Sequence, residues 1–106
     1  MKNFDLGDIV LIKFPFTGQQ NFKKRPALVL KDFGDDIIVC RITSKIYHSD
    51  YDILIEDWEA SQLKLKSVVR VHKIATLEKT MVDKVLKPVN AGIKAKIREN
   101  FIKLIE

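Results

Sequence analysis

Short apolar runs separated by polar turns fill the first half of the sequence. Residues 8–14, 25–30 and 37–43 are rich in valine, isoleucine and leucine, a composition typical of β-strands. Pro15 ends the first run because proline lacks the donor that a sheet requires, whereas Pro26 is tolerated near the start of the second. The pattern therefore predicts three strands before the middle of the chain.

The same pattern continues past the middle of the chain. Residues 34–36, Gly-Asp-Asp, predict a tight turn that joins the second and third runs as a hairpin. Residues 51–55 alternate apolar and polar side chains, which marks one buried face. Residues 67–77 form the longest strand candidate. A regular strand would place Arg70 and His72 on one side, about 7 Å apart, as a possible site.

Two short segments carry local helix signals. Residues 56–64 resemble a short turn of helix, with Trp58 and Leu63 pointing inward. Thr80 followed by Asp83 resembles a capping box and predicts a short helix that runs to about residue 84.

The C-terminal segment has the spacing of an amphipathic helix. Asn90 is placed to cap it. Its apolar positions recur at helical spacing and are Ile93, Ile97, Phe101, Leu104 and Ile105. We expect this stripe to cover the sheet, and a partner-binding role for the same stripe is the alternative.

Length and composition favour one soluble domain, residues 1–106, that is mainly β with helices. Several short strands, tight turns and a terminal helix favour a small, strongly bent antiparallel sheet or barrel. No apolar run approaches the roughly 18 residues of a membrane span, and the N-terminus does not resemble a signal peptide. Cys40 is the single cysteine, so neither a disulfide nor a thiolate zinc site is expected. These features predict a cytoplasmic protein without membrane contact.

Charge is distributed unevenly along the chain, whose formal net charge is +5. Residues 13–25 and 64–73 contain basic side chains and no acid, whereas residues 50–59 contain five acids and no base. This separation predicts one basic and one acidic surface, and a basic surface attracts polyanions such as RNA or DNA. Ordinary solvated charge on two loops is the alternative.

The connection between the first two strands, residues 15–24, is about ten residues long and polar, which is typical of loops that close over a ligand. Phe16 or Phe22 could stack on an unpaired base. Either ring could equally pack back on the barrel.

Four separated blocks together resemble a known family. They are G-D-I-V-L-I-x-F-P-F-T, R-P-A-L-V-L, I-T-S and S-V-V-R-V-x-K-I-x-T-L. In order and spacing they are similar to the MazF/PemK toxins of type II toxin–antitoxin systems, and to the subgroup with a Pro-Phe-Thr loop. The resemblance implies an SH3-like small barrel of the MazF/CcdB-like toxin fold with a C-terminal α-helix. It also implies a homodimer that binds and cleaves single-stranded mRNA sequence-selectively without a metal or other cofactor, and that a cognate antitoxin protein neutralises.

The resemblance assigns roles to individual residues. Arg25 and Thr43 match the usual catalytic pair of the family, and Arg70 matches an arginine that some relatives use in cleavage. His72 stands where those relatives carry an aspartate, so the general base stays open. RNA-binding positions implied by the motifs and the basic segments are Lys13, Phe16, Thr17, Phe22, Lys23, Lys24, Ser44, Lys45 and Lys73.

These residue types suit metal-free RNA cleavage, in which the ribose 2′-OH attacks the adjacent phosphate. The Arg25 guanidinium could bind two phosphoryl oxygens at once. Thr43 can donate or relay a hydrogen bond but is no base at neutral pH. An imidazole is suited to proton transfer near neutral pH, which makes His72 a candidate for this role.

Structural roles are the alternative for each of these residues. Arg25 could pair with a carboxylate at the strand start, and Arg70 and His72 could form a solvated face. His48 reads as an exposed loop residue, and two separated histidines make a poor metal site. A non-enzymatic toxin of the same fold that binds a protein target such as DNA gyrase is the alternative function, because small barrels host many functions.

Overall fold

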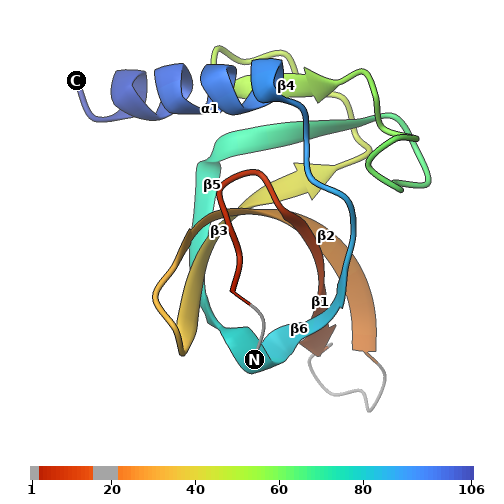
Figure 1. The fold of residues 1–106 in the computed structure, drawn as a ribbon. Coiled ribbons are helices and arrows are strands. Elements are labelled where there is room, and N and C mark those ends of the chain that lie inside the picture. The colour runs from red at the N-terminus through yellow and green to blue at the C-terminus, as the bar shows by residue number, and fades with distance from the viewer. Residues whose placement is uncertain (1–2, 16–21) are drawn as a thin grey trace.

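One antiparallel sheet of six strands makes up most of the structure, a computed structural model that describes residues 3–15 and 22–106. The strands are β1 (Ile9–Pro15), β2 (Phe22–Asp32), β3 (Asp36–Thr43), β4 (Asp52–Ile55), β5 (Ser67–Glu78) and β6 (Val82–Val85). The 3₁₀-helix η1 (Lys79–Met81) joins β5 to β6, and α1 (Ala91–Leu104) follows. Their order in the sheet is β4-β5-β3-β2-β1-β6. Figure 1 shows the sheet curling into a small barrel, with α1 outside it next to β4. The predicted mainly β fold with a C-terminal helix is confirmed.

Both faces of the sheet bury apolar side chains, which explains why the strands contain consecutive apolar residues. Inside the barrel, Val10, Ile12 and Val29 belong to one core. Their neighbours along the strands, such as Ile9 and Leu28, belong to a second core that Ile93 and Ile97 of α1 complete. Successive strand residues point to opposite faces, so a sheet covered on both sides needs apolar residues at consecutive positions.

Three irregularities bend the sheet enough to close it. Register shifts lie between Leu11 and Ile12, between Val29 and Lys31, and between Cys40 and Arg41. Each extra residue bends its strand and increases the local twist. Opposite the third shift, residues 71–73 of β5 have no partner in β3. The longest strand predicted from the sequence is thus confirmed in extent but is irregular between Arg70 and Ile74.

The carboxylate of Asp32 ties three parts of the barrel together. Lys79 Nζ lies 2.7 Å from Oδ1 and 2.8 Å from Oδ2. The backbone N–H groups of Phe4 and Gly34 donate to the same carboxylate over 2.7 and 2.8 Å. These hydrogen bonds, above all that from Lys79, lower the pKa of Asp32 to about 2. Asp32 therefore joins the N-terminal segment, the β2–β3 turn and the β5–β6 corner.

Two of the predicted helical segments are wrong. Residues 56–62 form consecutive turns instead of a helix, and Leu63 N–H donates to Trp58 O over 3.0 Å, although Leu63 is buried and Trp58 packs on the core as expected. The helix predicted from Thr80 to about residue 84 is present only as the 3₁₀-helix η1, which no side chain caps, because residues 82–85 pair with β1 as β6. Pairing along the edge of β1 satisfies the backbone hydrogen bonds of this segment and so overrides its local helix signal.

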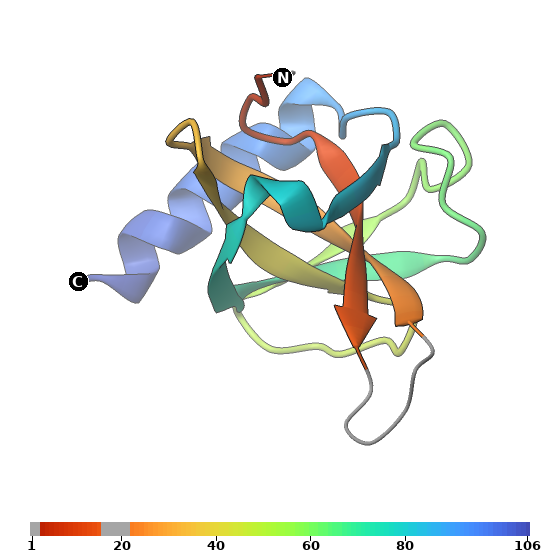
Figure 2. The same cartoon turned by 90° about the horizontal axis from the view of Figure 1, so that it is seen from below.

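The C-terminal helix begins as predicted and ends differently. The Asn90 side chain accepts a hydrogen bond from Ile93 N–H over 2.9 Å, which confirms the cap. Ile93 and Ile97 are buried, but Phe101 is 38% and Ile105 73% exposed. Figure 2 shows the reason: the second half of α1 extends past the barrel. The predicted continuous apolar cover is therefore wrong for the last turns, and within the described residues no helix is long and apolar enough to cross a membrane.

We expect Asp32→Asn to destabilise the protein at neutral pH and to lose this effect in acid. The folded-state pKa of about 2 lies below the ordinary 3.8, so the stability that Asp32 supplies is present above pH 3.8 and is lost as pH falls through 2. Thermal unfolding of both proteins between pH 7 and 2.5 measures the difference. Asp36→Asn, at an exposed carboxylate of the same hairpin, is the control. A difference between wild type and Asp32→Asn that stays constant with pH contradicts the assignment.

Shortening apolar side chains to alanine should distinguish the packed first half of α1 from its exposed end. Ile97→Ala removes a side chain that is 1% exposed and should cost about 2–5 kcal/mol of unfolding free energy, since it leaves a cavity. Ile105→Ala, at a position 73% exposed, should change that free energy by less than about 0.5 kcal/mol. Denaturant titration of both variants gives the two values, and equal losses would show that the last turn is packed.

Candidate functional site

A groove that we call the basic groove brings together the two most important candidates from the sequence, Arg25 and Thr43. Its volume is about 410 Å³. It is lined by parts of β1, β2, β3 and β6 and by the segment before β5, with an apolar floor that includes Leu11, Leu63 and Leu86. Five cationic side chains and no carboxylate are among its lining residues; the cations are Lys23, Lys24, Arg25, Lys64 and Lys84.

Arg25 and Thr43 reach the groove from neighbouring strands. β2 pairs with β3 as far as Ala27 and Arg41. Two residues further along, Arg25 pairs with Ile12 of β1 and Thr43 pairs with Val68 of β5, and both side chains line the groove. Arg25 is exposed, and none of the described carboxylates forms an ion pair with it. The alternative in which Arg25 pairs at the strand start therefore finds no support in the described part of the chain.

The Thr43 hydroxyl is held in one orientation at the end of β3. Its Oγ1 accepts a hydrogen bond from Lys45 N–H over 3.2 Å, and the residue is half-buried. Because a hydroxyl also carries one donor, the O–H proton remains available to a ligand in the groove. Ser44, another predicted RNA-binding residue, lines the groove beside it.

Asp83 neutralises part of the positive charge at the rim. Its carboxylate lies 2.8 Å from Lys24 Nζ and 3.3 Å from Lys13 Nζ. The hydrogen bond from Lys24, helped by the one from Lys13, outweighs desolvation and holds the pKa of Asp83 below its ordinary value. Lys24 thus lines the groove while paired, and Lys13 lies outside the groove lining.

Arg70 and His72 do not line the basic groove. Arg70 Nε donates to Asp52 Oδ1 over 2.8 Å, with side chains 12% and 1% exposed, and the guanidinium lies 3.6 Å from the centre of the Tyr47 ring. Burial opposes ionisation of Asp52, but hydrogen bonds from Arg70 and Ser49 outweigh it and lower the pKa. The alternative that Arg70 lies on a solvated face is wrong, because Arg70 forms an ion pair with Asp52 that is shielded from solvent.

The imidazole of His72 packs against Tyr51, with ring centres 5.8 Å apart. Its Nδ1 is buried and has no hydrogen-bond partner among the described residues. His72 is one of the residues 71–73 of β5 that have no partner in β3, so it does not lie in the regular strand that the sequence predicts. His72 therefore sits apart from Arg25 and Thr43 in the described structure.

The remaining residues proposed from the sequence lie at different places in the structure. Lys23 lines the groove, Lys45 Nζ lies 5.1 Å from the centre of the Tyr47 ring, and Lys73 is exposed outside the groove lining. The predictions for Phe16, Thr17 and the ring of Phe22 fall outside what the structure describes. His48 is exposed, as expected, and Cys40 is buried. In residues 3–15 and 22–106, no group of three or more potential metal-ligating side chains is clustered.

Two groove cations were missed among the sequence candidates. Lys64 belongs to the basic segment 64–73, and that membership is the signal that could have found it. Lys84 had no such signal, because the capping-box pattern placed it at the end of a helix. Only the pairing of β6 with β1 brings it to the groove.

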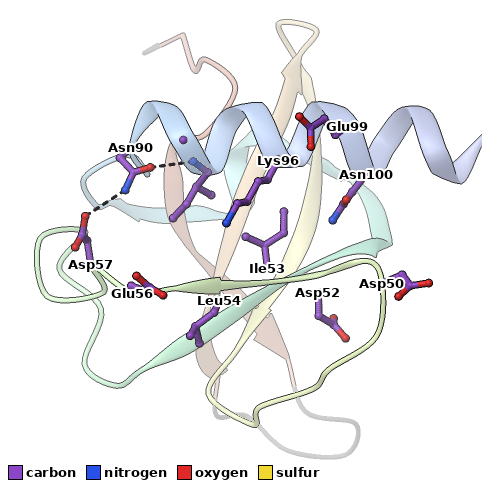
Figure 3. A pocket seen from close by; sticks show the side chains of 12 residues that line it. Asp50, Asp52, Ile53, Leu54, Glu56, Asp57, Asn90, Lys96, Glu99 and Asn100 are labelled. Atoms are coloured by element: carbon purple, nitrogen blue, oxygen red, sulfur yellow. Dashed lines mark hydrogen bonds between the residues drawn. The ribbon is translucent and has the colours of Figure 1, made fainter.

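A second groove, of about 500 Å³, has the opposite charge. Figure 3 shows it between α1 and β4, where Asp50, Glu56, Asp57 and Glu99 surround Lys96. Asp57 accepts a hydrogen bond from the Asn90 amide over 3.1 Å. This acidic groove shares no lining residue with the basic groove. The separation of charge that the sequence predicts is thus confirmed in the structure.

The barrel and its basic groove define a small barrel protein with a surface suited to polyanions. The family described as PemK-like, MazF-like toxin of type II toxin–antitoxin system matches residues 5–105. The chain belongs to this family, which confirms the resemblance found in the sequence. A search of curated proteins finds no match.

Solved structures share the fold at low sequence identity. A MazE–MazF structure from Deinococcus radiodurans matches with a TM-score of 0.79 and 21% identity over 99% of this chain and 97% of that one. An endoribonuclease from a mycobacterial species matches with a TM-score of 0.78 and 15% identity over 99% and 93%. A mycobacterial endoribonuclease in complex with its cognate antitoxin matches with a TM-score of 0.73 and 15% identity over 94% and 92%.

Removing the rim carboxylate should strengthen binding of polyanions. Asp83→Asn leaves Lys13 and Lys24 without this carboxylate and removes one negative charge beside the groove, so we expect elution from a heparin column at higher salt than wild type. Asp35→Asn, at an exposed carboxylate of the β2–β3 turn, changes the net charge equally and is the matched control. Equal shifts in the two variants would show that net charge alone sets the retention.

Proposed function

We propose that this protein is the toxin of a type II toxin–antitoxin system, a metal-independent and sequence-selective endoribonuclease that cleaves single-stranded mRNA in the cytoplasm and thereby inhibits translation and growth. The observation that carries the proposal is that Arg25 and Thr43 line the same groove, among whose described lining residues are five cations and no carboxylate. Membership in the MazF-like toxin family supports it. So do the structural neighbours whose names include endoribonuclease.

The chemistry assigned to the groove is attack of the ribose 2′-oxygen on the adjacent phosphorus. The P–O5′ bond breaks, which leaves a 2′,3′-cyclic phosphate and a free 5′-hydroxyl. Arg25 would bind two phosphoryl oxygens and stabilise the negative charge that grows on them. The Thr43 O–H would donate a third hydrogen bond to the same phosphate. Lys23, Lys64 and Lys84 would hold neighbouring phosphates of the strand.

Proton transfer is the step for which the groove supplies the fewest suitable side chains. Neither an imidazole nor a carboxylate is among the described lining residues. We therefore propose that water accepts the proton of the attacking 2′-OH. Water or a groove lysine donates a proton to the leaving 5′-oxygen. Arg70 and His72, which stand outside the groove, receive no role in contact with the reacting phosphate.

Protein partners complete the proposal. We infer a homodimer and a cognate antitoxin, for which the MazE–MazF and toxin–antitoxin complexes among the structural neighbours are the support. The exposed apolar residues Phe101 and Ile102 at the end of α1, with Ile105 just after it, offer a contact surface for a partner chain. An acidic antitoxin segment would block the basic groove by imitating the charge of RNA.

Arg25→Ala should lower the rate of cleavage by roughly 10²–10³-fold, the usual effect of removing one preorganised donor to a developing oxyanion. The measurement is the rate at which a long, defined RNA is cut in the presence of EDTA, with the cut ends mapped. Thr43→Val should lower the rate less, because one neutral hydrogen bond is weaker than a charged pair. His72→Gln should keep the wild-type pH profile.

Arg41→Ala is the matched control, since Arg41 is an exposed arginine of β3 that does not line the groove. Circular dichroism of each variant verifies the fold. Undiminished cleavage by Arg25→Ala would contradict the catalytic assignment. A wild-type protein that cuts no RNA at any pH but binds DNA gyrase tightly would favour the non-enzymatic alternative.

A further inference from the structure

A second depression adjoins the basic groove and carries an aromatic ring. Its volume is about 310 Å³, at the lower end of sites for small ligands, roughly 300–1,000 Å³. The chain segment that supplies Thr43 and Ser44 to the groove continues directly into the depression at residues 46–49. On the opposite wall, Lys64 and Ser67 line the groove, whereas their neighbours Lys66 and Val68 line the depression. Thr43 and Val68 are paired residues of β3 and β5, so the two sites lie next to each other although they have no lining residue in common.

Tyr47 is held rigidly within this depression. The Arg70 guanidinium lies 3.6 Å from the centre of its ring, and Arg70 is fixed by Asp52 over 2.8 Å. Asp52 is fixed in turn by Ser49, whose Oγ and backbone N–H donate to it over 2.7 and 2.9 Å. A planar ring stacked on an anchored guanidinium loses little conformational entropy when a second planar group stacks on it. Such a ring is a preorganised platform.

The charges around Tyr47 admit a polyanion. Asp52 is the one carboxylate among the described residues that line the depression, and Arg70 neutralises it. Lys66 and His48 supply positive or neutral polar groups, and Ile46 and Leu54 supply apolar surface. The depression also shares Asp52 and Leu54 with the acidic groove, so a phosphate chain would reach it from the side of the basic groove. The depression thus combines access from the basic groove, an aromatic face and no net negative charge.

We propose that the depression is a nucleobase subsite, in which an unpaired base next to the scissile phosphate stacks on Tyr47. Arg70 is then a positioning residue that acts through Tyr47 and does not touch the reacting phosphate. Base stacking on aromatic rings is the common means by which proteins hold single-stranded RNA. The inference rests on the proposed ribonuclease function and adds a site that contributes to the choice of sequence.

The test uses an RNA that carries a cut site mapped with the wild-type protein. A 2′-O-methyl group at the scissile ribose prevents cleavage, and 2-aminopurine replaces each neighbouring base in turn. Stacking on Tyr47 should quench 2-aminopurine at one of these positions. Tyr47→Leu should abolish that quenching and weaken binding roughly 5- to 150-fold, the loss of one base–aromatic stack. Tyr47→Phe and Tyr47→Trp, which keep a ring, should retain both.

Arg70→Gln separates a positioning role from a phosphate contact. We expect it to weaken both binding and quenching, while the slope of log affinity against log salt stays that of wild type. A direct phosphate contact would instead lower this slope by about 0.7 on single-stranded RNA. Tyr51→Leu, which removes an aromatic ring that lines neither site, is the matched control, and thermal unfolding verifies that each variant is folded.

The outcomes distinguish the subsite from the function on which it rests. If wild type cleaves RNA but Tyr47→Leu binds and quenches as wild type does, the subsite is wrong and the proposed function stands. Should Tyr47→Leu fail to fold, equal quenching by wild type, Tyr47→Trp and Tyr47→Phe supports the subsite, and absence of quenching in all three overturns it. If wild type neither binds nor cleaves RNA, both proposals fall.

Discussion

The side chain of Asp32 is the point on which closure of the barrel depends. One carboxylate accepts hydrogen bonds from the N-terminal segment, the β2–β3 turn and Lys79 at the β5–β6 corner. Lys79 is 4% exposed, and an ammonium so shielded from water requires a partner. The pairing fixes the direction in which the chain leaves β5. From that corner β6 runs back along β1, and Lys84 reaches the basic groove as a consequence.

Closure of the sheet also explains how a site forms at its open end. The strands β2 and β3 stop pairing with each other at Ala27 and Arg41, and beyond these residues β2 pairs with β1 and β3 pairs with β5. These strand ends carry Arg25 and Thr43, which line the basic groove. The groove combines apolar side chains with five cations, so a phosphate bound there would meet several donors. Geometry and electrostatics thus favour the same end of the barrel.

Arg70 shows how tertiary structure determines the contacts of a residue that a motif singles out. Its position in the Val-Val-Arg block suggests a catalytic group, yet Asp52 and Tyr47 occupy its guanidinium. Asp52 comes from β4, which pairs with β5 at Arg70. The ion pair explains why an arginine is tolerated on a strand whose neighbours Val69 and Val71 are fully buried. Arg70 also stacks on Tyr47 and so helps to hold the segment that follows Thr43.

The sequence by itself determined the local features and the family. Runs of β-branched residues predicted five of the six strands, Asn90 predicted the start of α1, and the charge segments predicted two surfaces of opposite sign. These features depend on neighbours a few residues apart, which a linear pattern records. Four ordered motif blocks were enough to indicate the MazF-like family.

Only the tertiary structure decided which residues meet. Residues 82–85 carry a local helix signal but form β6 because β1 offers an unpaired edge. The second half of α1 has the same apolar spacing as the first, but it has no sheet beneath it. Likewise the placement of Arg25 and Thr43 in one groove, and of Arg70 on Asp52, follows from strand pairing and from bulges. Such contacts join residues far apart in the chain, and their energies arise only when the folded backbone brings both partners together.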